Sequence, residues 1–310
     1  MATETGLPIV VGVDGTDQGR RAVDYGVHQA KRLGCGVRLV HAVHETAPMA
    51  PMLPLISVET FAEVGRRIVH EAEQQVRELD PTLSVESVVT PGSAVHVLSA
   101  AGEHARMIVL GHRDRSLLGR VLTSSTTTGV GARAHCPVVS VPSTWTATHV
   151  TGRIVVGVDD SAPAKDALAL AFSMAAERGA RLEVLHAWKL PSAYDDIIVS
   201  RVMLEDWKDH ATAEMHKTLG PWREEYPDVE VEIDIRHQYA APALVGASEG
   251  ADAVVIGRRG HGAPLGVYLG AVARTLIREA RCPVVVAPHR RPQDTLPEQR
   301  VRPEEVAPQT

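Results

Sequence analysis

The sequence has few cysteines, no long apolar run and few of the common catalytic signatures. Its three cysteines are too few and too scattered for a disulfide framework. No apolar run approaches the roughly 20 residues that a helix needs to span a bilayer. The first residues also lack the basic stretch of a signal peptide. These absences predict a cytoplasmic protein, in which Cys136 and Cys282, each followed by proline, act as small buried hydrophobes.

Charge and motif content exclude several classes of function. The formal net charge of -6 gives no electrostatic support for general binding to nucleic acid or to a membrane surface. The chain contains no Walker-type G-x4-G-K-[ST], no H-E-x-x-H and no cysteine pair with zinc spacing. No positioned base or arginine finger is visible either. We therefore expect no catalytic residue and no protein-held metal.

The chain repeats itself once. Four blocks recur in the same order: 9–14 as 154–159, 39–42 as 184–187, 108–111 as 254–257, and 136–139 as 282–285. The offset is 145 or 146 residues, a period of whole domains rather than of a solenoid repeat. The sequence therefore predicts a first domain over 1–142, a linker over 143–151, a second domain over 152–288 and a disordered tail over 289–310.

Within each half, short apolar runs alternate with helical stretches. The predicted strands lie near 8–13, 36–43, 84–90, 106–111 and 137–141, and again near 153–158, 181–187, 229–235, 252–257 and 283–287. This alternation predicts an α/β fold in which each half is a doubly wound, five-stranded parallel sheet with helices on both faces.

Two strand patterns predict how the sheets are arranged. The strand near 229–235 alternates Val or Ile with acidic residues, so one face is wet and the strand belongs at a sheet edge. The last strand of each half is apolar on both faces, although it ends its domain, and therefore needs cover. We expect the two last strands to pack against each other, which would join the halves as an intramolecular pseudo-dimer.

The first helix of each half carries small residues at a spacing of four. They are Ala22, Gly26 and Ala30 in the first half and Ala167, Ala171 and Ala175 in the second. Small side chains at this spacing predict a helix that lies close to the sheet. In the second half Ser161 is the expected N-cap, with Pro163 in the first turn.

Gly257, Gly260 and Gly270 form a G-x2-G-x9-G pattern between a buried strand and a helix. Glycines let a ligand approach the backbone closely, and the N–H groups at a helix start point outward. The pattern therefore indicates a phosphate-binding loop.

Taken together, the motifs resemble the universal stress protein family. They are the strand ending in V-G-V-D, the V-H-A or L-H-A block after the second strand, the glycine pattern, and C-P-V-V. The resemblance covers about 7–142 and 152–288. It implies an adenine-nucleotide α-hydrolase-like fold and a stress-response or signalling protein that binds ATP, with Mg²⁺, and whose ligand state tunes assembly or partner binding. It also implies a homodimer. Because no positioned base or arginine finger is visible, we expect ATP hydrolysis to be slow at most.

The same resemblance assigns the nucleotide-binding residues. In the second half they are Gly157, Asp159, Ala187, Ile256, Gly257, Arg259, Gly260, Gly270, Ala271 and Val272. In the first half they are Gly12, Asp14, Ala42, Gly111, Ser124, Ser125 and Thr126. Asp159 would face the adenosine, Ala187 would offer backbone groups to the adenine, and the backbone at the start of the last helix would bind phosphate.

Both halves depart from the family pattern. Ala271 stands where the family has Ser or Thr, although Arg258 and Arg259 offer compensating charge. In the first half Asp114 and Ser124 replace the second and third glycines. A carboxylate there repels polyphosphate, and a Cβ at Ser124 would crowd the ligand or demand an unfavourable backbone angle. We predict stronger binding in the second half, and a first site that is weaker, metal-assisted or empty.

Several alternatives stay open. Asp14 and Asp159 either contact ligand or only cap the turns after their strands. His41 and His186 are interpreted as hydrogen-bonded structural residues. The apolar loop 47–54 either covers the first site or contacts a partner. The rival function is a nucleotide-independent dimeric scaffold whose ATP sites have lapsed.

Overall fold

The computed structural model describes residues 6–43, 58–112, 123–148, 150–159, 162–189, 197, 203–258 and 268–288. For 58–60, 123–125 and 162–163 it describes the backbone alone. The loop 47–54 and the tail 289–310, with their predicted roles, lie outside these residues.

Each half follows the predicted alternation of strands and helices. The first half consists of β1 (Ile9–Gly12), α1 (Asp17–Leu33), β2 (Val37–Val43), α2 (Val58–Leu79), β3 (Val85–Pro91), α3 (Ala94–Ala101), η1 (Gly102–His104), β4 (Met107–Gly111), α4 (Thr123–Arg133) and β5 (Val138–Val141). The second consists of β6 (Arg153–Gly157), α5 (Ala162–Arg178), β7 (Arg181–Trp188), α7 (Leu204–Glu225), β8 (Val231–His237), α8 (Ala240–Ala247), β9 (Ala253–Gly257), α9 (Ala271–Glu279) and β10 (Val284–Ala287). The predicted strands are confirmed, because every boundary lies within two residues of the observed one.

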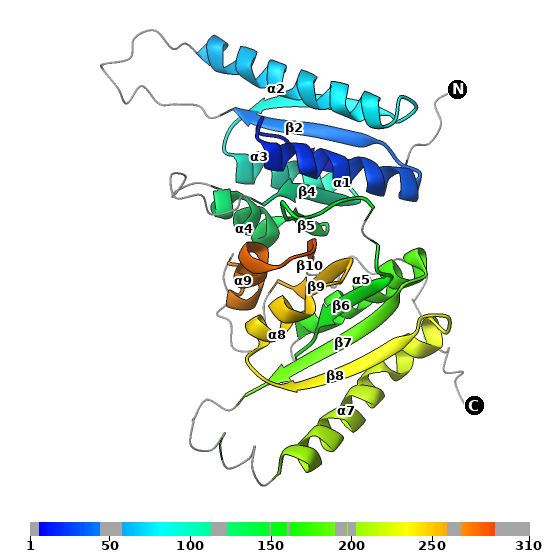
Figure 1. The fold of residues 1–310 in the computed structure, drawn as a ribbon. Coiled ribbons are helices and arrows are strands. Elements are labelled where there is room, and N and C mark those ends of the chain that lie inside the picture. The colour runs from blue at the N-terminus through cyan, green and yellow to red at the C-terminus, as the bar shows by residue number, and fades with distance from the viewer. Residues whose placement is uncertain are drawn as a thin grey trace, which may run out of the picture.

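The described strands form one continuous sheet. Their order is β3-β2-β1-β4-β5-β10-β9-β6-β7-β8. Neighbours within each half are parallel, whereas β5 and β10 pair antiparallel in the middle of the molecule, with Val139 opposite Val285 (Figure 1). The predicted contact between the last strands is therefore confirmed, and β8 is an edge strand, as its alternating pattern indicates.

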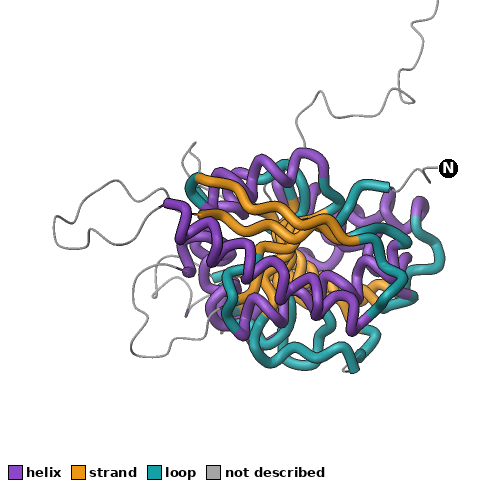
Figure 2. The backbone as a smooth tube through the Cα atoms, turned by 90° about the horizontal axis from the view of Figure 1, so that it is seen from above, coloured by secondary structure: helices purple, strands orange, loops and turns teal. Residues whose placement is uncertain are grey.

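Helices cover both faces of the sheet (Figure 2). On one face a single hydrophobic core runs across both halves and includes residues of α1, α2, α5 and α7. On the other face the α3–α4 pair and the α8–α9 pair cover separate clusters. Ala132 of α4 packs into the second-half cluster. The two halves therefore share packing on both sides of the β5–β10 pair.

The small residues of the first helices lie directly against the central strands. The alanines at the predicted positions are all fully buried: Ala22, Ala30, Ala167, Ala171 and Ala175. At Gly26 a Cβ would lie 2.5 Å from a methyl carbon of Val11 on β1, so even one added carbon would push α1 away from the sheet. The predicted close packing is confirmed. Ser161, the expected N-cap, lies outside the described residues, and α5 begins at the next residue.

The linker is attached to α1 by an aromatic contact. Trp145 packs edge-to-face on Tyr25, with 5.1 Å between ring centroids. Arg21 donates a hydrogen bond to the Trp145 carbonyl at 3.1 Å. On the same face of the sheet, Arg178 of α5 donates to the side chain of Gln29 at 3.3 Å. These contacts fix the halves relative to each other beyond the strand pairing.

In the described part of the chain, no helix combines the length and the hydropathy needed to cross a membrane.

The close approach of α1 to β1 predicts opposite effects for two Gly→Ala substitutions in helices. Gly26→Ala gains helix propensity but overpacks the core, so we expect a net loss of about 1–2 kcal/mol in the free energy of unfolding. Gly246→Ala, at an exposed position of α8 with nothing within 4 Å of the added carbon, should gain about 0.5–1 kcal/mol. Urea denaturation of both variants tests this. Equal midpoints would show that α1 does not pack as described.

Candidate functional site

A cavity of about 580 Å³ opens at the carboxyl ends of β6, β7 and β9. In the strand order β7 and β9 lie on opposite sides of β6, so the cavity sits at the topological switch point of the second half. Its lining includes Gly157, Asp159, Ala187, Ile256, Gly257, Gly270, Ala271 and Val272. All of these are residues that the sequence assigned to nucleotide binding.

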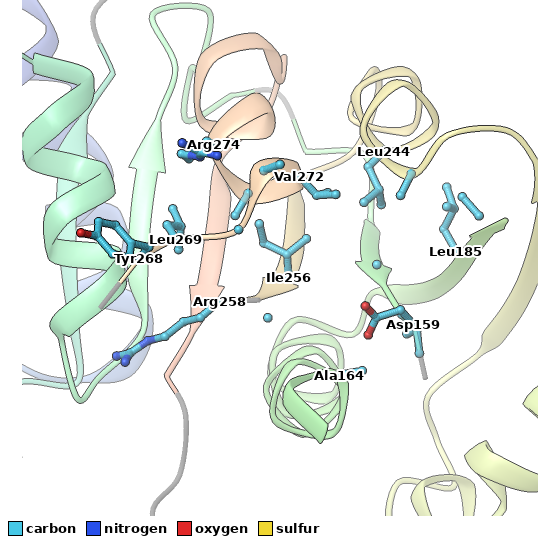
Figure 3. Close-up of a pocket in the computed structure, with 18 of the residues that line it drawn as sticks. Asp159, Ala164, Leu185, Leu244, Ile256, Arg258, Tyr268, Leu269, Val272 and Arg274 are labelled. Atoms are coloured by element: carbon cyan, nitrogen blue, oxygen red, sulfur yellow. The ribbon is translucent and has the colours of Figure 1, made fainter. Parts of the chain in front are cut away.

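The cavity has opposite charge at its two ends. Asp159 lies at one end, after β6, whereas Arg258 and Arg274 lie toward the boundary with the first half (Figure 3). Apolar side chains, among them Ile256 and Val272, lie between them. The arrangement suits a ligand with hydrogen-bond donors at one end, an apolar ring system in the middle and an anion at the other end.

The start of α9 presents backbone N–H groups to the cavity. Gly270 is the N-cap of this helix and has no side chain to cap it. Its own N–H donates to the Arg258 carbonyl at 2.8 Å, which holds the helix start beside the end of β9. Ala271 and Val272 in the first turn line the cavity. Uncapped N–H groups and the positive end of the helix dipole make this wall suitable for phosphate.

The two switch-point aspartates differ in their surroundings. The Asp14 carboxylate accepts hydrogen bonds from the N–H and the hydroxyl of Thr16, at 3.1 and 2.5 Å. A Cβ at Gly19 would lie 2.7 Å from this carboxylate. Ala164 is the equivalent residue in the second half and does carry a Cβ. Asp14 therefore caps the turn before α1, and the residue beside it differs between the halves.

The corresponding cavity of the first half measures only about 120 Å³. The predicted residues Gly12, Asp14, Ala42, Gly111 and Thr126 line it. A Cβ at Gly111 would lie 2.1 Å from the Gln18 carbonyl, so the start of α1 closes directly over the end of β4. The first half therefore has the site residues but little space between them.

The structure tests only part of what the sequence predicts for the two glycine loops. Asp114, Arg259 and Gly260 lie outside the described residues. Ser124 and Ser125 lie in the first turn of α4, where the structure describes their backbone alone. The expected unfavourable backbone angle at Ser124 is wrong. Its equivalent Gly270 has φ −61°, an angle that any residue adopts, and no described residue other than glycine has positive φ.

The cavity also includes residues that the sequence did not indicate. Arg274 follows Gly270 by one helical turn and so lies on the same face of α9. The spacing of four residues from Gly270 could have identified Arg274 as a cavity residue. Thr128 comes from α4 of the first half. No local pattern indicates it, because its position depends on how the halves pack.

Comparisons with known proteins identify the family. The model of the universal stress protein family matches residues 7–142 and 151–288. The chain belongs to the universal stress protein family.

Relatives in this family match nearly the whole chain. A universal stress protein of Mycobacterium bovis is 31% identical over 290 residues, which is 90% of this chain and 96% of the relative. One of Mycobacterium tuberculosis is 29% identical over 316 residues, covering 94% and 98%. The crystal structure of a universal stress protein from Archaeoglobus fulgidus has the same fold, with a TM-score of 0.66 at 19% identity over 91% of this chain and 98% of that one.

The two histidines of this family member are structural, as expected. His41 Nδ1 lies 2.7 Å from the Val13 carbonyl, and His186 Nδ1 lies 3.0 Å from the Val158 carbonyl. Because a carbonyl can only accept, Nδ1 carries the proton in both rings. Each histidine thereby holds the end of the first strand of its half beside the second strand.

One sequence motif of a catalytic type is present, but its serine has a structural role. Residues 246–250 read G-A-S-E-G, which matches the G-x-S-x-G elbow of hydrolases. Ser248 is fully buried at the end of α8 rather than exposed on a turn between strand and helix. Its hydroxyl donates to the Val245 carbonyl and accepts from the Arg281 N–H, at 2.6 and 2.9 Å. The residue therefore joins α8 to the end of α9 and cannot act as a nucleophile.

The cysteines are buried, and their thiols should be unreactive. Burial raises the pKa of Cys136 and Cys282 to about 12 and also raises that of Cys35. Because the pKa of every thiol lies above its ordinary value of 9.0, all three are predominantly protonated at pH 8. We expect an aromatic disulfide reagent at pH 8 to label none of them in the folded chain and all three in denaturant. Rapid labelling of the folded chain would contradict the burial.

Proposed function

We propose that the chain binds an adenine nucleotide, ATP with Mg²⁺, in the second-half cavity, and that its ligand state tunes assembly or partner binding in a stress response. The observation that carries this proposal is the polarised cavity. It combines a carboxylate, an apolar middle, an uncapped helix start and two arginines, within the 300–1,000 Å³ typical of small-molecule sites.

Each wall of the cavity has a part in the proposed complex. Asp159 accepts hydrogen bonds from the ribose hydroxyls, and the backbone at Ala187 meets the adenine. Ile256 and Val272 cover the apolar faces of the base and sugar. The N–H groups at Ala271 and Val272 donate to phosphate, so the missing hydroxyl at Ala271 removes one contact without removing the backbone donors.

The first-half cavity is proposed to stay empty or to bind weakly. Its volume of about 120 Å³ is well below the range of small-molecule sites. One carboxylate oxygen of Asp14 is already engaged by Thr16. The two sites of the chain are then unequal, and a single bound nucleotide per chain influences both halves.

The proposal also includes a cytoplasmic homodimer of tandem chains that makes no contact with membrane or nucleic acid and hydrolyses ATP slowly, if at all. The alternative is a nucleotide-independent dimeric scaffold. The continuous sheet favours that alternative, because β5 and β10 join the halves without any ligand. Ligand binding is therefore the property that separates the two functions.

Isothermal titration of the full chain with ATP and Mg²⁺ tests the proposal, with the two switch-point aspartates as a matched pair. Asp159→Ala removes a charged acceptor of hydroxyl hydrogen bonds and should weaken binding by about tenfold or more. Asp14→Ala should leave the affinity within about twofold, because Asp14 belongs to the smaller cavity.

Wild-type protein that binds no ATP at millimolar concentration would support the scaffold instead. Equal losses for the two aspartate variants would contradict the assignment of the ligand to the second half. Circular dichroism of both variants verifies that each is folded.

A further inference from the structure

The second-half cavity is built by both halves of the chain. Thr128, on α4 of the first half, lines it together with Tyr268 and Arg274 of the second. The helices α4 and α9 pack together beside it, and a Cβ added at Gly131 would lie 3.7 Å from Leu269, just before α9. Arg258 spans the same boundary and donates to the Ala132 carbonyl at the end of α4, at 3.3 Å. The end of the cavity opposite Asp159 is thus an interdomain surface.

Arg274 brings an uncompensated positive charge to this surface. It lies in the first turn of α9, where its charge adds to the positive end of the helix dipole. Within the described residues, no hydrogen bond or ion pair joins its guanidinium to another group. Arg278, one turn further along, instead lies 3.7 Å from Glu279 and does not line the cavity. The difference singles out Arg274 as a charge available to a ligand.

The repeat explains why these two residues meet. Thr128 and Arg274 are equivalent positions in the two halves, 146 residues apart. The antiparallel pairing of β5 with β10 brings α4 and α9 together, and both residues then line one cavity. An arginine at both of these equivalent positions would add like-charge repulsion between α4 and α9. One arginine and one hydroxyl instead form a mixed donor pair that suits a phosphate group.

From this geometry we infer that the second-half site selects nucleoside polyphosphates, with Arg274 and Thr128 binding the terminal phosphates across the boundary between the halves. The inference rests on the proposed function, because it assigns the far end of the same site. Asp159 lies at one end of the cavity, and Tyr268 and Arg274 lie at the other (Figure 3). A ligand anchored at Asp159 therefore reaches the boundary only if its phosphate chain is long enough. AMP would bind without this contact.

The contact has a consequence for the assembly. A bound polyphosphate would connect α9 of the second half to α4 of the first, whereas a monophosphate would touch the second half alone. Discrimination between ATP and AMP would then depend on a residue of the first half.

Isothermal titration of the full chain with ATP and with AMP tests the inference through Arg274→Gln and its control Arg278→Gln. Loss of a charge-assisted contact at an exposed position should weaken ATP binding by roughly tenfold in Arg274→Gln and AMP binding by less than about twofold. Arg278→Gln should change neither affinity. Thr128→Val should weaken ATP binding by roughly threefold. Thr128→Ser, which keeps the hydroxyl, should bind ATP as the wild type does.

The outcomes separate this inference from the proposed function. A wild-type chain that binds neither nucleotide overturns both. If the wild type binds ATP and Arg274→Gln binds it as tightly as Arg278→Gln does, only the interdomain contact is wrong. Equal losses for ATP and AMP would also overturn it, because the effect would then not depend on the phosphate chain.

Discussion

The pairing of β5 with β10 is the constraint on which the rest of the structure depends. Both strands are valine-rich and buried on their two faces, and each ends its half, so either half alone would expose a hydrophobic sheet edge. Pairing them turns two edges into the centre of one sheet and brings α4 beside α9. The interdomain end of the second cavity exists only because of that juxtaposition.

Duplication followed by divergence accounts for the inequality of the two sites. The switch-point aspartates, the structural histidines and the strand registers agree between the halves. The difference lies in a few small residues. Gly19 lies close beside the Asp14 carboxylate, whereas the equivalent residue of the second half is Ala164. The halves thus share a fold and differ in the residues around their cavities.

The sequence predicts most of the fold, because apolar patterns are local. It also predicts the part of the cavity wall that carries the family motif, because that motif can be read from the sequence. Apolar runs identify the strands, and the two-sided apolar character of the last strands predicts their contact. The residues assigned by the family motif line the larger cavity where the structure describes them. Thr128 escapes prediction because its place depends on interdomain packing. The small volume of the first-half cavity also escapes prediction, because no motif encodes how closely the start of α1 approaches Gly111.

In the proposed complex one chain holds one nucleotide, in its second half. Native mass spectrometry of the full chain with excess ATP and Mg²⁺ measures this stoichiometry directly. We predict one ATP per chain in the wild type, one in Asp14→Ala and a strongly reduced bound fraction in Asp159→Ala. Two ATP molecules per chain, or a bound ATP that is lost with Asp14 rather than with Asp159, would contradict it.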